Sequence, residues 1–252
     1  MLFLVGTGIA YNDIPMRAIE VCKRCTLYAE IYTSISDEAK MKYLSDLFGK
    51  EIKILSREDM EEGAKEIVAK AAKANIAILV AGDPLMATTH KILIIEAKKQ
   101  GISTQILHAS SAISAVIGES GLDFYKFGAI CTIPKWHDNY KPVSFYEKIE
   151  RNFSSNLHSL VLLENSPEKG STLPVPDAIM ELEAAESHYK KGIIGESTKI
   201  FIMQNIGLPS QKIVATTIKA ARSHRSEGVA TIIIPVKLSE IEEEAVKSLT
   251  VV

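Results

Sequence analysis

Cysteine is scarce in this sequence and occurs in an odd number. The 252 residues include three cysteines, Cys22, Cys25 and Cys131. Such a count argues against a disulfide framework and favours a reducing compartment, the cytoplasm. Cys22 and Cys25 have the spacing of a redox or zinc site, but no second pair and no nearby histidine cluster completes one. We therefore predict that both pack as small apolar residues on a helix and that no metal is bound.

Long apolar runs and an excess of charge are also lacking. No apolar stretch approaches the ~18 residues of a membrane span. Met1 leads directly into the apolar residues 2–5, which predicts a first strand rather than a signal peptide. Lys and Arg number 29 against 31 Asp and Glu, so the net charge of −2 provides no general attraction to nucleic acid or to an anionic membrane. No HExxH, GxSxG or P-loop motif appears, which leaves metalloprotease, nucleophilic hydrolase and kinase functions unsupported.

Residues 76–90 are the stretch around which the rest of the chain is organised. Residues 76–80 form an apolar run typical of a strand buried on both faces of a parallel sheet. Gly82 and Pro84 then permit and fix a turn, which holds Asp83 at the carboxyl end of the strand. Ligands of open α/β sheets bind at that end. A plain strand-to-helix turn is the alternative explanation of the same residues. In both cases a helix is predicted over 87–100.

The first half of the chain alternates strands and helices. The apolar runs predict strands at 2–5, 28–32, 52–55, 76–80 and 102–107. Asp13 and Ser56 are expected to cap the helices that follow the first and third strands. This order predicts a mostly parallel sheet with right-handed crossovers. Ser111 is expected either to cap a helix over 112–117 or to line a binding loop.

The second half has strands that helices separate less regularly. Strands are predicted at 127–133, 157–163, 199–206 and 229–234, and helices at 174–189 and 241–249. We therefore expect an α/β protein of two domains, 1–110 with a parallel sheet and 111–252 with a mixed sheet. The loop 136–144 between two of the strands holds the sole tryptophan, Trp136, with His137, Tyr140 and Lys141. Its exposed aromatic residues indicate a contact surface or a lid on its own domain.

Gly6 and Gly8 leave a nucleotide-binding oxidoreductase open as an alternative. They follow the first strand as in a dinucleotide fingerprint, and Glu30 lies where a ribose-binding acid would fall. The third glycine of the fingerprint is replaced by Tyr11. A tight strand-to-helix connection accounts for the two glycines equally well.

Taken together, the motifs identify a family. The stretches that carry the likeness are residues 1–8 (MLFLVGTG), 32–34 (YTS), 49–52 (GKEI), 55–59 (LSRED), 82–90 (GDPLMATTH), 125–128 (YKFG) and 144–149 (SFYEKI). The sequence resembles the diphthine synthases, methyltransferases of the tetrapyrrole-methylase fold. Gly-Asp-Pro is shared across that fold, whereas Gly-Asp-Pro-Leu followed by Ala-Thr-Thr-His is far more specific.

The resemblance implies a cofactor and the residues that contact it. S-adenosyl-L-methionine would bind in a cleft between the domains, and S-adenosyl-L-homocysteine would be the product. By position, the family's cofactor contacts are Ile9, Asp83, Met86, Ser111, Ala112, Leu163, Ile206 and Ala230. Several would act through backbone groups. No catalytic residue is implied, because the methyl group of a sulfonium is already activated and alignment accounts for much of the acceleration.

The resemblance also implies a protein substrate. This would be translation elongation factor 2, whose 3-amino-3-carboxypropyl histidine is methylated repeatedly toward diphthine. Archaeal members stop at trimethylation and eukaryotic members also esterify the carboxylate; residues 144–149 look more like the latter. A homodimer is expected. The alternatives are a corrin-precursor methylase of the same fold and a non-catalytic partner of the translation machinery. Residues 55–59 and 87–90 are the stretches that distinguish a diphthine synthase from a corrin-precursor methylase. Methyl-transfer activity would exclude the non-catalytic partner.

Overall fold

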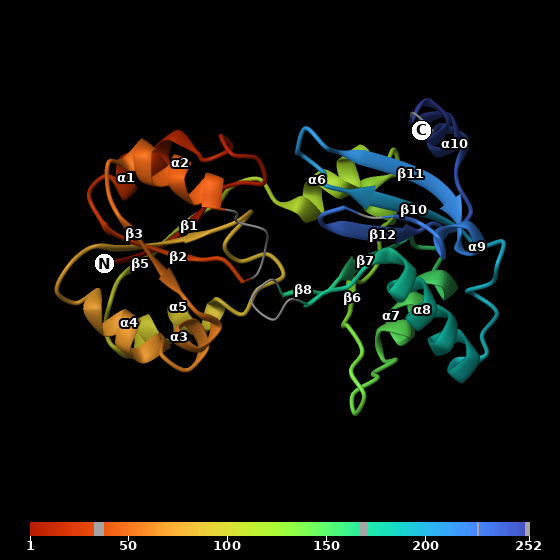
Figure 1. Cartoon of the computed structure of the whole chain (residues 1–252), viewed down its shortest axis with the longest axis horizontal. Coiled ribbons are helices and arrows are strands. Elements are labelled where there is room, and N and C mark those ends of the chain that lie inside the picture. Colours follow the sequence, from red (N-terminus) through yellow and green to blue (C-terminus); the bar gives the residue numbers. More distant parts are fainter. Residues whose placement is uncertain (33–37, 167–170, 226, 250–252) are drawn as a thin grey trace. The chain divides into compact units, whose positions relative to one another are not determined.

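The chain divides into two compact α/β units. The structure is a computed structural model that describes residues 1–32, 38–166, 171–225 and 227–249 (Figure 1). The first unit contains Met1–Ile113. The second contains Ser114–Asn165 and the described residues from 171 onward. Among the described residues, no helix combines the length and apolar character that a bilayer crossing requires.

The first unit is built on a five-stranded parallel sheet. Its strand order is β3-β2-β4-β1-β5, with bounds β1 (Leu2–Gly6), β2 (Thr26–Glu30), β3 (Ile52–Leu55), β4 (Ile76–Val80) and β5 (Thr104–Leu107). Every pairing in it is parallel, as the alternation of strands and helices predicted. The central strands β1 and β4 are buried at all five positions. This explains their unbroken apolar sequences, since neither face meets water.

Helices cover both faces of this sheet (Figure 1). On one face lie α1 (Met16–Cys22) and α2 (Glu38–Phe48), and on the other lie α3 (Arg57–Glu61), α4 (Ala64–Lys70) and α5 (Lys91–Lys99). Alternate residues of β1 divide between the two cores: Leu4 packs with one set and Val5 with the other. Cys22 and Cys25 belong to the core under α1 and α2, at 0% and 4% exposure, so their predicted packing role is confirmed. Only Cys22 lies on the predicted helix, because α1 ends there and Cys25 follows in the turn before β2.

Two predicted helix starts in this unit are wrong. Asp13 does not cap α1: Pro15 is the N-cap, without a side-chain hydrogen bond, and Asp13 instead accepts hydrogen bonds from loop backbone. The helix predicted over 87–100 begins only at Lys91. Turns occupy the residues before it, and Ala87 has a φ of 54°, outside the helical region.

The sequence predicts a single helix from Ser56 through Ala74, but this stretch forms two helices, α3 and α4. Ser56 caps the first of them through a capping box with Asp59, as its position indicated. The break is at Gly63, where a Cβ would lie 2.8 Å from the carbonyl oxygen of Asp59. Sequence reasoning also missed α2 altogether.

The second unit is built on a mixed five-stranded sheet, as predicted. Its order is β11-β10-β12-β7-β6, with bounds β6 (Cys131–Ile133), β7 (Ser159–Leu163), β10 (Lys199–Gln204), β11 (Lys212–Thr217) and β12 (Ala230–Ile234). β6 and β7 are parallel and the other pairs are antiparallel. β11 was not predicted, and the strand expected over 127–133 is short, because only Phe127 forms a bridge before Cys131.

The helices of the second unit pack around this sheet. They are α6 (Ala112–Glu119), the 3₁₀ turn η1 (Phe124–Lys126), α7 (Phe145–Ser154), α8 (Val175–Tyr189), α9 (Ile218–Ala221) and α10 (Glu240–Ser248). Two short strands, β8 (Asn165–Ser166) and β9 (Ser171–Thr172), form a separate two-stranded sheet. α7 and α8 lie on one face of the sheet in Figure 1. Phe145, Tyr146 and Ile149 of α7 are buried there, in a helix that the sequence pattern does not predict.

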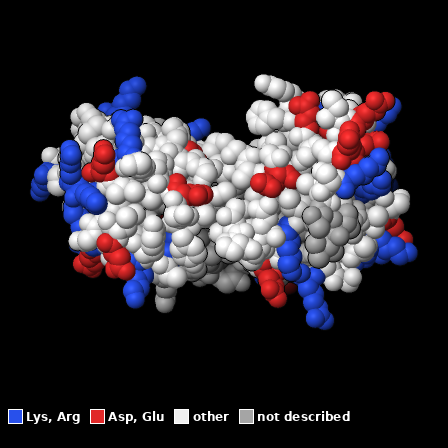
Figure 2. All heavy atoms as spheres, turned by 90° about the horizontal axis from the view of Figure 1, so that it is seen from above, with Lys and Arg blue, Asp and Glu red and all other residues white. Residues whose placement is uncertain are grey.

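Charged side chains of both signs are interspersed on the surface. The face drawn in Figure 2 shows Lys and Arg alongside Asp and Glu on each unit, and neither sign covers a unit. This distribution agrees with the near-balance of charges in the sequence.

Candidate functional site

Three loops meet at the carboxyl ends of the strands in the first unit. Residues 7–13 follow β1, residues 81–90 follow β4 and residues 108–111 follow β5. Gly8 and Gly82 form a small antiparallel bridge, with the two N–H···O distances at 3.3 and 3.0 Å. Both glycines have φ of +71°, a conformation that other residues rarely adopt.

Gly6 allows the loop after β4 and the loop after β5 to approach each other across the end of β1. Strands β4 and β5 are not neighbours, because β1 lies between them. A Cβ on Gly6 would lie 2.6 Å from the carbonyl oxygen of Gly82 and 2.8 Å from the Cβ of Ala109. Glycine is therefore needed at this position for close packing of backbone rather than for a dinucleotide fingerprint.

The approach of these loops brings Asp83 and His108 together. Asp83 is 7% exposed, and its Oδ1 accepts a hydrogen bond from the backbone N–H of Leu85 at 3.0 Å. Its Oδ2 lies 2.7 Å from His108 Nδ1 and 3.4 Å from the backbone nitrogen of Ala109. The His108 side chain is 67% exposed. The acid is thus fixed inside the loop cluster while the imidazole extends from it.

Asp13 ties the first loop to the third. Its Oδ2 accepts hydrogen bonds from the backbone of Ala10 at 3.0 Å and Ile9 at 3.2 Å, and from Ser110 Oγ at 2.9 Å. These bonds, that of Ala10 first, lower the pKa of Asp13. The buried Lys40 Nζ donates to the carbonyl of Gly8 at 2.9 Å, which adds a second contact to the same loop. Sequence reasoning missed this role of Asp13.

The more specific motif residues hold the Gly-Asp-Pro loop in place. The carbonyl oxygen of Pro84 accepts hydrogen bonds from Thr88 Oγ1 at 3.2 Å and from His90 Nδ1 at 3.0 Å. His90 is buried, and its Nε2 lies 3.5 Å from the hydroxyl of Tyr32. Tyr32 begins the motif 32–34, whose other residues, Thr33 and Ser34, lie outside the described residues. The motif thus shapes a loop, and His90 is part of its support.

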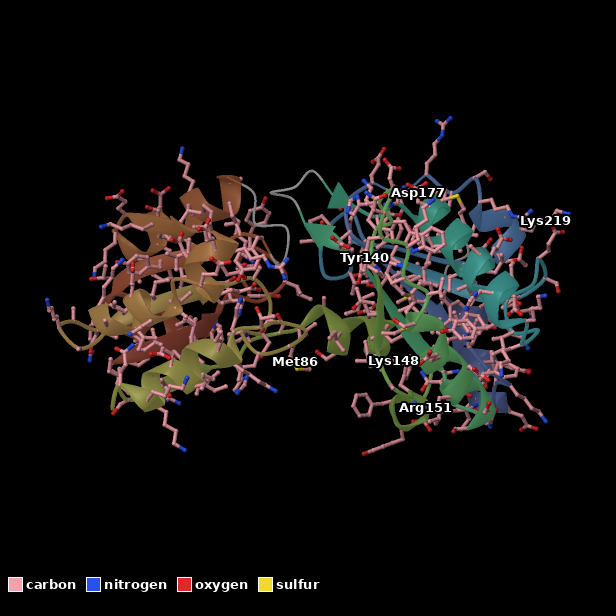
Figure 3. The ribbon with its side chains drawn as sticks, turned by 90° about the horizontal axis from the view of Figure 1, so that it is seen from below. Met86, Tyr140, Lys148, Arg151, Asp177 and Lys219 are labelled. Carbon is pink, nitrogen blue, oxygen red and sulfur yellow. The ribbon has the colours of Figure 1, made fainter. Side chains whose placement is uncertain are left out.

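Five of the expected cofactor contacts lie in this loop cluster or immediately beyond it. Ile9 donates its N–H to Ser110 Oγ as well as to Asp13, and Ser111 is buried at the start of α6, where its hydroxyl accepts from the N–H of Ile113 at 3.3 Å. Met86, labelled in Figure 3, is 46% exposed. Ala112 is exposed. The structure therefore brings Ile9, Asp83 and Ser111 to one edge of the first sheet.

The other three expected contacts converge at one end of the second sheet. Leu163 ends β7, Ala230 begins the antiparallel neighbour β12, and Ile206 follows β10 closely. Gln204 pairs with Ala230, and the N–H of Asn205 donates to the carbonyl of Val229 at 2.9 Å. Leu163, Ile206 and Ala230 are 6–8% exposed.

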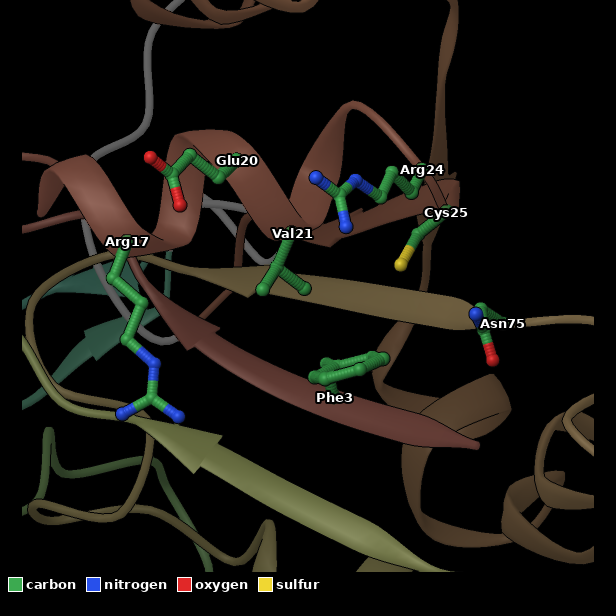
Figure 4. Close-up of a pocket in the computed structure, with 7 residues that line it drawn as sticks. All are labelled: Phe3, Arg17, Glu20, Val21, Arg24, Cys25 and Asn75. Atoms are coloured by element: carbon green, nitrogen blue, oxygen red, sulfur yellow. The ribbon is translucent and has the colours of Figure 1, made fainter.

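A pocket elsewhere in the first unit lies away from these loops. It has a volume of about 260 Å³ and is lined by Phe3, Arg17, Glu20, Val21, Arg24, Cys25 and Asn75 (Figure 4). Cys25 and Asn75 directly precede β2 and β4, so the pocket lies at the amino ends of the strands. Burial raises the pKa of the Cys25 thiol, which keeps it protonated and poorly nucleophilic.

The loop 135–144 is anchored to the second unit by hydrogen bonds to Glu164 and to the buried Glu181. Trp136 donates its backbone N–H to Glu181 Oε1 at 3.0 Å and its indole N–H to the carbonyl of Pro142 at 3.0 Å. Glu181 is 1% exposed, its Oε2 has no hydrogen-bond partner in the described part of the chain, and burial raises its pKa to about 7. Tyr140 is 61% exposed at the turn (Figure 3). Tyr140 is therefore the large aromatic side chain that this loop exposes most, whereas Trp136 is half-buried.

Comparison with known proteins assigns this fold and loop cluster to a family. Residues 1–222 match the model of the tetrapyrrole (corrin/porphyrin) methylases, so the chain belongs to that family. It is accordingly a methyltransferase, and the oxidoreductase alternative is wrong.

Relatives over nearly the whole chain carry more specific names. The diphthine synthase of Methanocaldococcus jannaschii is 36% identical over 99% of this chain and 98% of its own. The diphthine methyl ester synthase of Mus musculus is 35% identical over 87% of this chain and 85% of its own. A solved diphthine synthase structure has a TM-score of 0.87 over 99% of this chain and 95% of its own, at 24% identity, and so shows the shared fold. The resemblance inferred from the motifs is confirmed.

Proposed function

We propose that this methyltransferase uses S-adenosylmethionine to methylate the amine of the 3-amino-3-carboxypropyl histidine of translation elongation factor 2. The observation that carries the proposal is the likeness to diphthine synthases along the full chain, at 36% identity over 99% of its length. A tetrapyrrole methylase would share the fold, but the two relatives described above are named for diphthine.

The residues at the strand ends fit the cofactor by position and by chemistry. Small residues there, Gly82, Ala109 and Ala112, leave main-chain groups accessible to a nucleoside and an amino-acid moiety. A Cβ on Gly82 would meet the carbonyl oxygen of Ser110 at 3.8 Å, an ordinary van der Waals contact, so no atom crowds this position of the loop. We propose Ile9, Asp83, Met86, Ser111, Ala112, Leu163, Ile206 and Ala230 as the contacts, Asp83 acting by holding the loop. When bound, S-adenosylmethionine supplies a methyl group activated by its sulfonium.

The decisive experiment is mass spectrometry of elongation factor 2. The factor carrying the 3-amino-3-carboxypropyl group is incubated with this protein and S-adenosylmethionine, and the mass gain of the modified peptide is measured. We expect successive gains of one methyl group. Three correspond to the quaternary amine and a fourth to an ester, which would distinguish the two reaction types in the relatives' names.

The control is the same factor with an unmodified histidine, which lacks the amine and should gain no methyl. Equal labelling of the two forms, or labelling of neither, would refute this acceptor. Transfer to a corrin precursor instead would identify the enzyme as a tetrapyrrole methylase.

Three further features belong to the same proposal. The enzyme is a homodimer, it acts in the cytoplasm, and it contacts the elongation factor through residues 136–141. Light scattering on the purified protein should give about twice the chain mass of 27.6 kDa. A monomeric mass would contradict the dimer and leave the reaction unaffected.

A further inference from the structure

His108 and Asp83 have the arrangement of an oriented acid–base pair. The Asp83 carboxylate accepts only, so the 2.7 Å contact places a proton on His108 Nδ1. In the neutral imidazole, Nε2 then carries the lone pair. With 67% of the side chain exposed, this lone pair belongs to a group that solvent and a substrate can reach. A buried carboxylate that fixes the tautomer in this way is a recurring means of preparing a histidine base.

Two other histidines lack this freedom. His90 is 1% exposed, with Nδ1 on the Pro84 carbonyl and Nε2 near the Tyr32 hydroxyl. His158 is fully buried, with Nδ1 on a backbone N–H and Nε2 on a carboxylate. Both rings serve the fold. His108 instead lies on a loop at the carboxyl ends of parallel strands, where ligands of such sheets bind.

We propose that His108 is the general base of this enzyme, its Nε2 taking the proton from the substrate ammonium before each N-methylation. This inference rests on the proposed function, because it requires an amine acceptor. An amine of this kind is mainly protonated at neutral pH, and an ammonium has no lone pair with which to attack. A base placed beside it removes that obstacle.

The proton and electron balance of each step is simple. The N–H bond of the ammonium breaks and its proton bonds to His108 Nε2, which gives an imidazolium. The freed nitrogen lone pair forms a bond to the methyl carbon while the carbon–sulfur bond breaks, leaving its electron pair on sulfur. His108 then releases its proton to water. Three such deprotonations take an ammonium to the quaternary amine, whereas an ester methyl transferred to a carboxylate requires none.

The charged groups around this loop suit the imidazolium that forms. Asp83 faces it directly at Nδ1. Asp13 lies behind the same loop, bonded to Ser110, and Lys40 is held on the carbonyl of Gly8. The neighbouring carboxylate stabilises the protonated ring, as in other pairs where an acid supports a histidine base.

The test is the pH dependence of His108→Asn. Asparagine retains a side-chain N–H close to the Nδ1 position, so Asp83 keeps its donor, but the basic Nε2 is gone. At pH 7 we expect N-methylation to slow by about 100-fold or more, the usual contribution of a positioned base. S-adenosylhomocysteine affinity should stay within twofold. His188→Asn, at an exposed histidine on α8, is the matched control and should behave as the unaltered enzyme.

The pH profile separates a base from a merely structural residue. In His108→Asn, the rate of N-methylation should rise about tenfold per pH unit toward the pKa of the amine, because only the free amine reacts. The difference in rate between the variant and the unaltered enzyme should therefore shrink as pH rises. A deficit that is constant from pH 6.5 to pH 9, or a loss of S-adenosylhomocysteine binding equal to the loss of rate, would overturn the assignment. If the unaltered enzyme methylates no modified elongation factor, the proposed function fails instead, which is a different result.

Discussion

Four hydrogen-bond donors converge on the carboxylate of Glu242, which therefore offers a sharp test of how the second unit is held together. Oε1 accepts from His158 Nε2 at 2.8 Å and from the backbone of Asp123 at 3.1 Å. Oε2 accepts from Lys126 Nζ at 2.8 Å and from the backbone of Ser239 at 2.7 Å. Burial alone would raise the pKa of Glu242, but the bonds from Lys126, Ser239 and His158 hold it well below its usual range.

Glu242→Gln keeps the shape of the side chain and removes half of its acceptors. Whichever way the amide is turned, its NH₂ group faces two donors. His158 cannot adapt, because its Nδ1 already accepts the N–H of Val236 at 3.1 Å. Two bonds to a charged group are lost, at about 1.5–3 kcal/mol each. We therefore expect a loss of about 3–5 kcal/mol in the free energy of unfolding, the range for breaking a buried ion pair.

Urea denaturation followed by tryptophan fluorescence measures this loss. Trp136 is the sole tryptophan and lies in the second unit, so its emission reports that unit. With a slope of about 2 kcal/mol per molar urea, the midpoint should fall by about 2 M. Glu243→Gln, the exposed neighbour on α10, should leave the midpoint unchanged. Equal midpoints for the two variants would show that the four short contacts contribute little.

Further predictions concern both units. Because burial raises the pKa of Glu181 to about 7, the folded second unit binds a proton that the unfolded chain releases near pH 4.3. Its stability should therefore fall as pH rises from about 4.5 to 7, by on the order of 2–3 kcal/mol, and Glu181→Gln should abolish this slope; the same slope in the variant would argue against the assignment. Asp83→Ala should weaken S-adenosylhomocysteine binding at least about tenfold in calorimetry while circular dichroism stays unchanged, since loss of a buried charge-assisted contact typically exceeds 1.4 kcal/mol; unaltered affinity in the folded variant would contradict this role. Replacing Cys22 and Cys25 with alanine should lower the melting temperature by a few degrees through lost packing and leave methyl transfer intact; stoichiometric zinc that disappears in this variant would contradict the packing role. Tyr140→Ala should raise KM for the modified elongation factor several-fold without changing cofactor affinity, as for an exposed aromatic contact; an unchanged KM would show that the loop contacts only its own unit.

Sequence periodicity determined most of the fold. Buried parallel strands require unbroken apolar runs, and β1 and β4 have them, so the parallel first sheet could be predicted. Elements with mixed burial were missed. All but the first residue of β11, at the edge of the second sheet, are half-buried, and α7 buries its apolar face in a core shared with α8 and the sheet. Their patterns depend on partners that are distant in the chain.

The candidate site divides in the same way. The sequence alone placed Asp83 after a buried strand, because glycine and proline fix the local turn. It could not pair Asp83 with His108, since β1 separates their strands, and only the missing side chain at Gly6 lets the two loops meet. Nor could it show that Asp13 ties two loops instead of capping a helix. Local backbone chemistry is encoded in neighbouring residues, whereas contacts across a sheet follow from strand order and from the space between loops, which the tertiary structure decides.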